Sequence, residues 1–148
     1  MSDHVVKVIP RSPQQGVPEA VLASAVRYLN GTVAADRIEA HTYETPAFID
    51  CGSNLEEIRC SLCGNELSFD WWGEAMDIAA QTGFASLEVT MPCCGGESSL
   101  NDLKYNFPCG FACAEIELLN PTSEIDPACI AQLEAIFGFP VRLIHAHI

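Results

Sequence analysis

Two short cysteine clusters constrain this chain more than any other feature of its sequence. The first is Cys60-Ser61-Leu62-Cys63-Gly64, and the second is Pro92-Cys93-Cys94-Gly95-Gly96. They flank a segment whose pattern predicts a helix followed by a strand. Together the clusters supply four thiols, which is the donor set of a closed tetrahedral zinc site. We therefore predict one structural zinc ion, with these ligands: Cys60, Cys63, Cys93 and Cys94.

The two clusters differ in spacing. The first has the C-x-x-C-G spacing of a zinc knuckle, in which glycine supplies the backbone freedom that the turn needs. If Cys94 is aligned on Cys63, Met91 falls where the first thiol of the second cluster should be. Adjacent cysteines can both reach one metal when the backbone turns sharply, and the neighbouring Pro92 and glycines favour such a turn. The alternative keeps Cys94 and takes the fourth ligand from elsewhere in the chain: Cys51, Cys109 or Cys113.

Other uses of the thiols are weaker interpretations. A redox C-x-x-C pair usually opens a helix after a strand, whereas Gly64 indicates a turn after Cys63. The cysteines outside the clusters are more typical of small buried hydrophobic residues, and this includes Cys129. Trp71 and Trp72 are expected to pack in the core or beside the metal site instead of forming a ligand platform.

Catalytic signals are sparse. Nucleophile, phosphate-binding and dinucleotide-binding motifs are missing from the sequence, and a four-thiolate site leaves no open position for water. Glu115, Glu117 and His145 would form a catalytic group only if the strands that carry them were neighbours. His145 and His147 share a strand face, which is compatible with metal binding but more typical of a polar sheet edge. We predict no catalytic or cofactor-binding residues and lean against an enzyme.

Length and charge narrow the class of protein. A chain of 148 residues with 49% hydrophobic content suits one domain with its own core. Its start lacks the features of a signal peptide, so reduced thiols and a cytoplasmic location are expected. No stretch approaches the roughly 18 to 20 apolar residues of a membrane span. Seven Lys and Arg against twenty Asp and Glu give a formal charge of −13, which disfavours nucleic acids and favours either a basic protein partner or simply solubility.

Periodicity predicts a layered fold. Strands are expected over 5–9, 87–91, 111–119 and 141–148. Pro46 interrupts the stretch 36–51, which is expected to be an edge strand or a strand plus loop. Three helices are expected from capping signals: one from Pro18 to Asn30-Gly31, one capped by Asp70 and ended by Gly83, and one from Asp126-Pro127 to Gly138. The last strand, helix and strand form a βαβ-type unit. The prediction is an α/β or α+β fold, 1–148 as a single domain, with a mixed sheet, three helices and a zinc-ribbon-like, metal-clamped insert at about 58–104.

One strand makes a prediction about individual side chains. Alternation over 111–119 places one set of residues inward: Ala112, Ala114, Ile116 and Leu118. Cys113, Glu115 and Glu117 then lie on the opposite face.

Several motifs together resemble a family of bacterial proteins of similar length, over roughly residues 48 to 148. The motifs are Cys60-x-x-Cys63-Gly64, Trp71-Trp72 with Met76, Pro92-Cys93-Cys94-Gly95, Ser99-Leu100-Asn101-Asp102-Leu103, Gly110-Phe111-Ala112 and a final strand with His147. The resemblance implies a bacterial cytoplasmic protein in which the two clusters act as a unit. It implies no activity.

These patterns favour a zinc-stabilised, acidic protein-interaction module. A specific version is an immunity or antitoxin-like protein that binds a basic partner through carboxylates such as Glu88, Glu115, Glu117 and Glu124. The alternatives are a small enzyme with an unrecognised cleft and a thiol-based metal-handling or redox protein.

Overall fold

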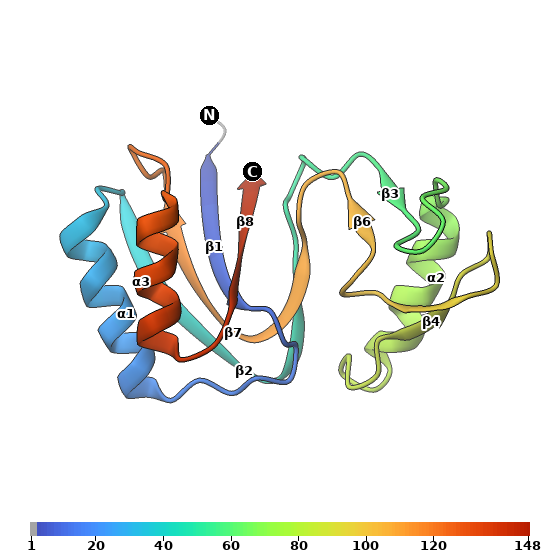
Figure 1. Cartoon of the computed structure of the whole chain (residues 1–148), viewed down its shortest axis with the longest axis horizontal. Coiled ribbons are helices and arrows are strands. Elements are labelled where there is room, and N and C mark those ends of the chain that lie inside the picture. Colours follow the sequence, from blue (N-terminus) through green and yellow to red (C-terminus); the bar gives the residue numbers. More distant parts are fainter. Residues whose placement is uncertain (1–2) are drawn as a thin grey trace.

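The computed structural model describes residues 3–148 and has an α+β fold, as predicted. Its main body consists of β1 (His4–Pro10), α1 (Glu19–Thr32), β2 (Arg37–Ile49), β7 (Gly110–Leu119), α3 (Pro127–Phe137) and β8 (Val141–His147). The four strands form one sheet in the order β2-β7-β1-β8. The two helices lie side by side against this sheet (Figure 1). β2 is an edge strand, as predicted, and its pairing is irregular between Thr42 and Ala47, around Pro46.

The connections define a known topology. Neighbouring strands of the sheet run antiparallel, which makes β1 parallel to β2 and β7 parallel to β8, each across one intervening strand. Each parallel pair is joined by a helix. The body is therefore two split β-α-β units, the arrangement of the ferredoxin-like fold. The predicted βαβ-type unit is present as β7, α3 and β8, with β1 between its two strands.

The core of the body lies between the sheet and its two helices. Alternate residues of β7 enter this core, including Ala114, Ile116 and Leu118, each at most 2% exposed. Leu29 of α1 and Leu133 of α3 are fully buried in the same cluster. The period-two pattern of the sequence predicted these inward residues because a strand places alternate side chains on opposite faces.

The ends of the two body helices were predicted with unequal success. The side chain of Asp126 accepts a hydrogen bond of 2.8 Å from the backbone N–H of Cys129, and Gly138 ends α3 with a φ of +84°. Both features were predicted. The predicted stop of α1 at Asn30-Gly31 is wrong, because the helix continues to Thr32. A glycine inside a helix costs only about 1 kcal/mol, which the packing of Leu29 readily offsets.

The chain between β2 and β7 forms a second lobe, residues 50–109, which we call the insert lobe (Figure 1). It contains β3 (Ile58–Arg59), α2 (Phe69–Ala80), β4 (Glu88–Thr90), β5 (Glu97–Ser99) and β6 (Lys104–Tyr105). β3 pairs with β6, and β4 pairs with β5. The cap of α2 is Ser68, whose hydroxyl accepts from Trp71 N–H at 3.1 Å, so the prediction of Asp70 as the cap is wrong.

The insert lobe has its own apolar core, to which the body contributes. Ile58, Leu100 and Met91 are at most 1% exposed in this core, and Phe111 from β7 is buried with them. Trp71 and Trp72 pack against the same cluster, in line with the prediction that they serve packing. The start of β7 thus contributes a side chain to the core of the insert lobe.

Two polar side chains fasten the insert lobe to the sheet. Asn101, 7% exposed, donates to the carbonyl of Arg11 at 3.2 Å and accepts from the N–H of Phe111 at 3.1 Å. Arg142 on β8 donates to the carbonyls of Asn101 at 3.0 Å and Cys109 at 2.8 Å. Each of these hydrogen bonds has a backbone group as one partner. The side chains of Asn101 and Arg142 therefore hold the main chain of the insert lobe and the main chain of the body together.

Candidate metal centre

The first cysteine cluster forms a tight turn directly after β3. The N–H of Cys60 donates to the carbonyl of Asn65 at 2.9 Å, and the N–H of Gly64 donates back to the carbonyl of Cys60 at 3.1 Å. Gly64 has a φ of +78°, in the left-handed region that favours glycine. The C-x-x-C-G spacing is thus explained by the turn, which needs glycine immediately after Cys63.

The second cluster forms the same turn at the tip of the β4–β5 hairpin. The N–H of Met91 donates to the carbonyl of Gly96 at 2.8 Å, and the N–H of Gly95 donates to the carbonyl of Met91 at 2.9 Å. Gly95 has a φ of +72°. Met91 therefore occupies the backbone position that Cys60 occupies in the first turn, as the alignment of the two clusters suggested. Its side chain is buried in the core of the lobe, and Cys93 supplies the missing thiol.

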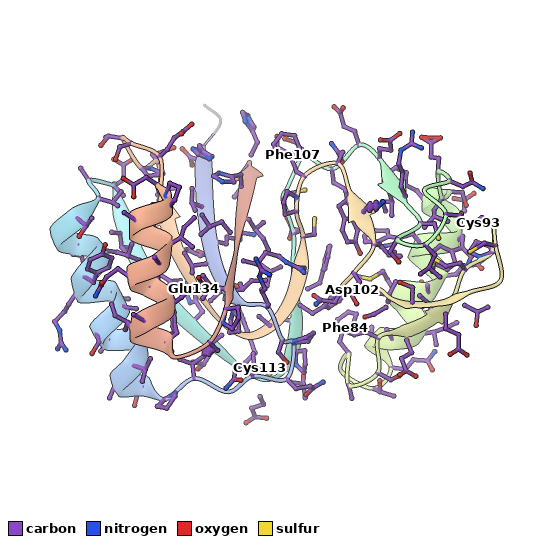
Figure 2. The ribbon with its side chains drawn as sticks, in the orientation of Figure 1. Phe84, Cys93, Asp102, Phe107, Cys113 and Glu134 are labelled. Carbon is purple, nitrogen blue, oxygen red and sulfur yellow. The ribbon has the colours of Figure 1, made fainter. Side chains whose placement is uncertain are left out.

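The two turns bring four sulfur atoms together. The Sγ atoms of Cys60, Cys63, Cys93 and Cys94 all lie within 4.8 Å of one another. Cys60 and Cys94 are 3.9 Å apart, and Cys63 and Cys93 are 3.3 Å apart. A tetrahedral zinc ion with Zn–S bonds of about 2.3 Å places its sulfurs about 3.8 Å from one another. This donor set can hold a metal ion, at the outer end of the insert lobe where Figure 2 shows Cys93.

Backbone and solvent act differently on the four thiols. Cys60 is fully buried, whereas the other three are exposed. Hydrogen bonds from the N–H groups of Cys63 and Leu62 lower the pKa of Cys60 to about 6. Loss of solvent, followed by the facing thiol of Cys63, raises the pKa of Cys93 to about 12. One thiol of the cluster is thus prepared by its own turn to act as a thiolate ligand.

Direct contacts hold the two turns against each other. The hydroxyl of Ser61 in the first turn is hydrogen bonded to the hydroxyl of Ser98 on β5, the strand that follows the second turn. Gly96 faces Leu62 so closely that a Cβ at this position would lie 2.5 Å from Leu62 Cδ1. The first turn is also braced by Arg59, which donates to the carbonyl of Gly64 at 3.0 Å and pairs with Glu57 at 2.7 Å. The pair of turns is therefore built by protein contacts as well as by its sulfurs.

The cysteines considered as substitute ligands lie elsewhere. Cys51 and Cys109 are at most 1% exposed and have their sulfurs 3.3 Å apart, at the junction of the two lobes. The thiol of Cys113 lies 3.4 Å from the carbonyl of Pro13. Cys129 lies on the buried face of α3. In the part of the chain that the structure describes, the four-sulfur group is the combination predicted from the two clusters.

The weak catalytic group of the sequence is not assembled. β1 separates β7 from β8, and His145 pairs in register with Val6, whose side chain lies on the helix-covered face. Glu115 and Glu117 lie on the other face of the sheet. His145 instead stacks on His4, with ring centroids 5.6 Å apart and a nitrogen contact of 3.4 Å. The condition for a catalytic group of Glu115, Glu117 and His145, that the strands carrying them be neighbours, is therefore not met.

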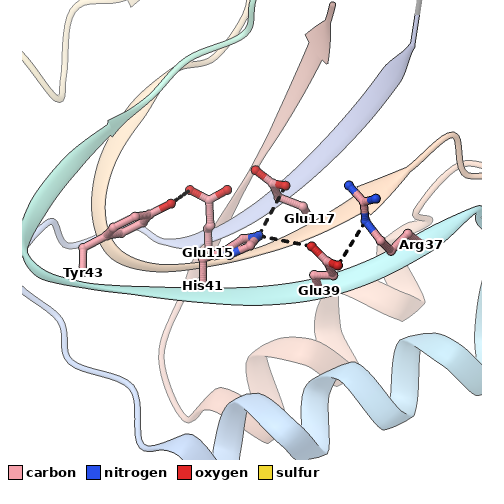
Figure 3. Close-up of polar contacts among 6 residues, drawn as sticks. All are labelled: Arg37, Glu39, His41, Tyr43, Glu115 and Glu117. Carbon is pink, nitrogen blue, oxygen red and sulfur yellow. Dashed lines mark hydrogen bonds and ion pairs between the residues drawn. The ribbon is translucent and has the colours of Figure 1, made fainter.

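A polar cluster lies on the face of the sheet opposite the helices, and the sequence did not predict that its members come together (Figure 3). Tyr43 of β2 donates to Oε2 of Glu115 at 2.9 Å, and His41 lies 3.5 Å from Glu117 and 3.6 Å from Glu39. Arg37 pairs with Glu39 at 3.1 Å. Alternation within each strand places these residues on one face, but the register between β2 and β7 had no signal in the sequence.

Glu115 is the unusual member of this cluster. It is 3% exposed, and its Oε1 atom is buried without a hydrogen-bond partner among the described residues. Burial, followed by the neighbouring carboxyl of Glu117, raises its pKa to about 7. Its inclusion among the carboxylates that would bind a basic partner is therefore wrong, because a partner cannot reach it.

Comparison with known proteins does not identify this arrangement. The chain matches no protein-family model, and neither the curated proteins nor the solved structures give a significant match. The resemblance inferred from the cysteine and tryptophan motifs remains a prediction. Among residues 3–148, no helix combines the length and the apolar character needed to cross a membrane.

Proposed function

We propose that the protein is an acidic protein-interaction module whose insert lobe is held in shape by one zinc ion bound to Cys60, Cys63, Cys93 and Cys94. The observation that carries the metal assignment is the mutual approach of four sulfurs, within 4.8 Å, from two turns far apart in the sequence. Zinc bound there would cross-link the two turns and add its binding free energy to folding.

A structural role for the metal follows from the donor set. Four protein thiolates fill a tetrahedral coordination sphere, which leaves no position for a reactive water. Each turn is closed by its own backbone hydrogen bonds. The hydrogen bond between Ser61 and Ser98 joins the first turn to β5. These features suit a site that fixes the shape of a lobe.

The interaction role rests on charge. The formal charge of −13 gives the surface a field that attracts basic proteins and repels nucleic acids. An immunity or antitoxin-like protein that neutralises a basic partner is the specific form of this proposal. Glu88 and Glu124, both exposed, are carboxylates that such a partner can reach.

The metal is tested by elemental analysis of protein purified without chelator, with cobalt(II) substitution to report the ligands. We expect about one zinc per chain, and the cobalt form should show the charge-transfer and d–d bands of tetrahedral four-thiolate coordination. Protein without zinc, or a cobalt spectrum unchanged by Cys93→Ser, would contradict the assignment. The interaction role is tested by capture of basic proteins at low and high salt, because an electrostatic complex should weaken with ionic strength.

One observation favours a second candidate, thiol-based metal handling. Cys63, Cys93 and Cys94 are exposed, so a competing chelator can reach them. A metal-handling protein should give up its ion within seconds to a chelator and keep its fold. A structural site should release the ion slowly and lose the fold of the insert lobe at the same rate.

A further inference from the structure

A groove runs along the insert lobe between α2 and β4. Its wall on the helix includes Trp71, Ala75 and Ile78, and Leu100 and Val89 form the other side. The hollow has a volume of about 360 Å³, and Ile78 is 67% exposed at its mouth. An apolar groove of this kind, bordered by a helix and a strand, can take an apolar side chain from another molecule.

The strand that borders the groove has a free edge. Leu100 N–H donates to the carbonyl of Leu87, and Met91 N–H donates to the carbonyl of Gly96, both at 2.8 Å. In an antiparallel ladder these bonds recur at every second residue, so the backbone groups of Glu88 and Thr90 point away from β5. Within the described chain, β4 has β5 as its sole strand partner. Glu88 and Thr90 both line the groove, which places the free edge along it.

The surroundings of the groove are acidic. Glu74 and Glu88 stand on its rim. A second hollow shares Glu88 and Thr90 with the first and adds Glu97 and Asp102. Among the described residues, neither hollow is lined by Lys or Arg. The groove therefore combines an apolar floor with an unbalanced negative rim.

We propose that this groove binds an extended basic segment of a protein partner, which adds a strand to the free edge of β4. Backbone groups of Glu88 and Thr90 pair with the segment, one apolar side chain enters the hollow beside Trp71, and flanking Lys or Arg side chains meet the acidic rim. This inference rests on the proposed interaction function and locates its surface. Because Cys93 and Cys94 lie in the turn of the same hairpin, the metal-site turn also fixes the position of the binding edge.

The test uses a fluorescein-labelled peptide of about ten residues that alternates lysine with valine, titrated with the full zinc-loaded chain at about 150 mM salt. A peptide of the same length with glutamate in place of lysine controls for charge. A version methylated on alternate backbone nitrogens controls for strand pairing. We expect saturable binding of the first peptide, with the largest amide chemical-shift changes at Glu88 and Thr90, and binding at least about tenfold weaker for both controls.

Matched variants separate the groove from general electrostatics. Glu88→Lys and Glu44→Lys change the charge equally, but Glu44 is exposed on β2 of the body and lines neither hollow. Thr90→Pro removes an outward-facing N–H that the β4–β5 ladder does not use. We expect at least about tenfold weaker binding for Glu88→Lys and Thr90→Pro, and less than about twofold for Glu44→Lys. If Thr90→Pro misfolds, the comparison of the two charge reversals and the amide chemical-shift changes test the proposal.

The outcomes distinguish the groove from the wider function. Equal weakening by the two charge reversals, or no binding of the basic peptide, overturns the groove. If a basic protein captured from solution still binds Glu88→Lys with full affinity, the groove is wrong and the interaction function stands. If no basic protein binds wild-type chain at any salt concentration, the interaction function itself fails.

Discussion

The sulfur atoms of Cys51 and Cys109 lie 3.3 Å apart in the buried junction between the sheet and the insert lobe. Cys51 comes just after β2 and Cys109 just before β7, so the two thiols mark the points where the chain leaves the sheet and returns to it. Burial, followed by the thiol of Cys51, raises the pKa of Cys109. Both side chains therefore act as small apolar residues of the junction.

The first prediction concerns this junction. Cys109→Ser should lower the free energy of unfolding by about 1–3 kcal/mol, because it introduces a hydroxyl into a buried apolar site. Cys113→Ser is the matched control on β7, the strand that Cys109 precedes. The thiol of Cys113 is partly exposed, and its replacement should cost less than about 1 kcal/mol. Urea denaturation measures both. Equal losses would mean that the junction is no better packed than the face that carries Cys113.

The second prediction concerns the metal site. Cys63→Ser should lower stability by several kcal/mol, because a structural metal contributes its binding free energy to the folded state. Cys129→Ser, a substitution in the buried face of α3, should cost about 1–3 kcal/mol. Thermal denaturation with zinc content measured for each variant provides the comparison. Similar losses for the two would make the metal peripheral to the fold.

The third prediction concerns pH. The pKa of Glu115 is raised to about 7, whereas a glutamate in an unfolded chain has a pKa of about 4.3. At a pH between these two pKa values, the folded state keeps a proton on Glu115 that the unfolded chain has released. The contribution of Glu115 to stability therefore falls as the pH rises from about 4.5 to 7. Glu115→Gln should remove that loss and stabilise the protein by about 1–3 kcal/mol at a pH of about 8.

The measurement is the free energy of unfolding at about pH 5 and pH 8 for wild type and Glu115→Gln. Glu39→Gln is the control, because that side chain lies on the same face with 44% exposure. The neighbouring Glu117 has a lowered pKa, first because of the adjacent carboxyl of Glu115, and it contributes in the opposite direction. A pH profile unchanged by Glu115→Gln would refute the assignment.

The fourth prediction compares two glycines. Gly52 has a φ of +62°, and a Cβ there would overlap the backbone carbonyl of His147. Gly73 lies inside α2 with open space where its Cβ would be. Gly52→Ala should therefore destabilise the protein by more than about 1 kcal/mol, and Gly73→Ala should stabilise it by about 0.5–1 kcal/mol. Chemical denaturation tests the opposite signs directly.

The fifth prediction concerns nucleic acids. With a formal charge of −13, the chain gains nothing from displacing the counterions of a phosphate backbone. Fluorescence anisotropy with random duplex and single-stranded oligonucleotides at about 150 mM salt should show no binding. Micromolar affinity would restore a nucleic-acid-binding function for the cysteine turns.

Local signals were the most predictable part of this structure. The cap at Asp126, the end of α3 at Gly138 and the first cysteine turn each depend on residues within one turn of backbone, so spacing alone sufficed. The second cysteine turn was ambiguous because Met91 holds the place of a thiol. Cys93 is identified as the second thiol of this turn only by its approach to Cys63 in the folded chain, which depends on how α2 and the hairpin pack.

Long-range pairing accounts for what the sequence did not predict. Glu115 follows the alternation of an outward residue, yet it is buried. The pairing of β2 with β7 places Tyr43, which lies 72 residues earlier in the sequence, over it. The pairing of β1 with both β7 and β8 places β1 between them, which separates His145 from Glu115. Neither the register nor the strand order has a counterpart in local composition, since both depend on which apolar faces meet in the folded chain.

The pairing of Ile49 with Gly110 has a consequence for how this chain is organised. Because these residues end β2 and begin β7, two antiparallel neighbours, the entire insert lobe occupies the place of a hairpin loop. A tight turn there would leave the strand order and both body helices intact. It would, however, expose Phe111 and remove the carbonyl acceptors of Arg142. Phe111 and Arg142 are thus two side chains of the sheet whose burial and hydrogen bonds depend on this particular insert lobe.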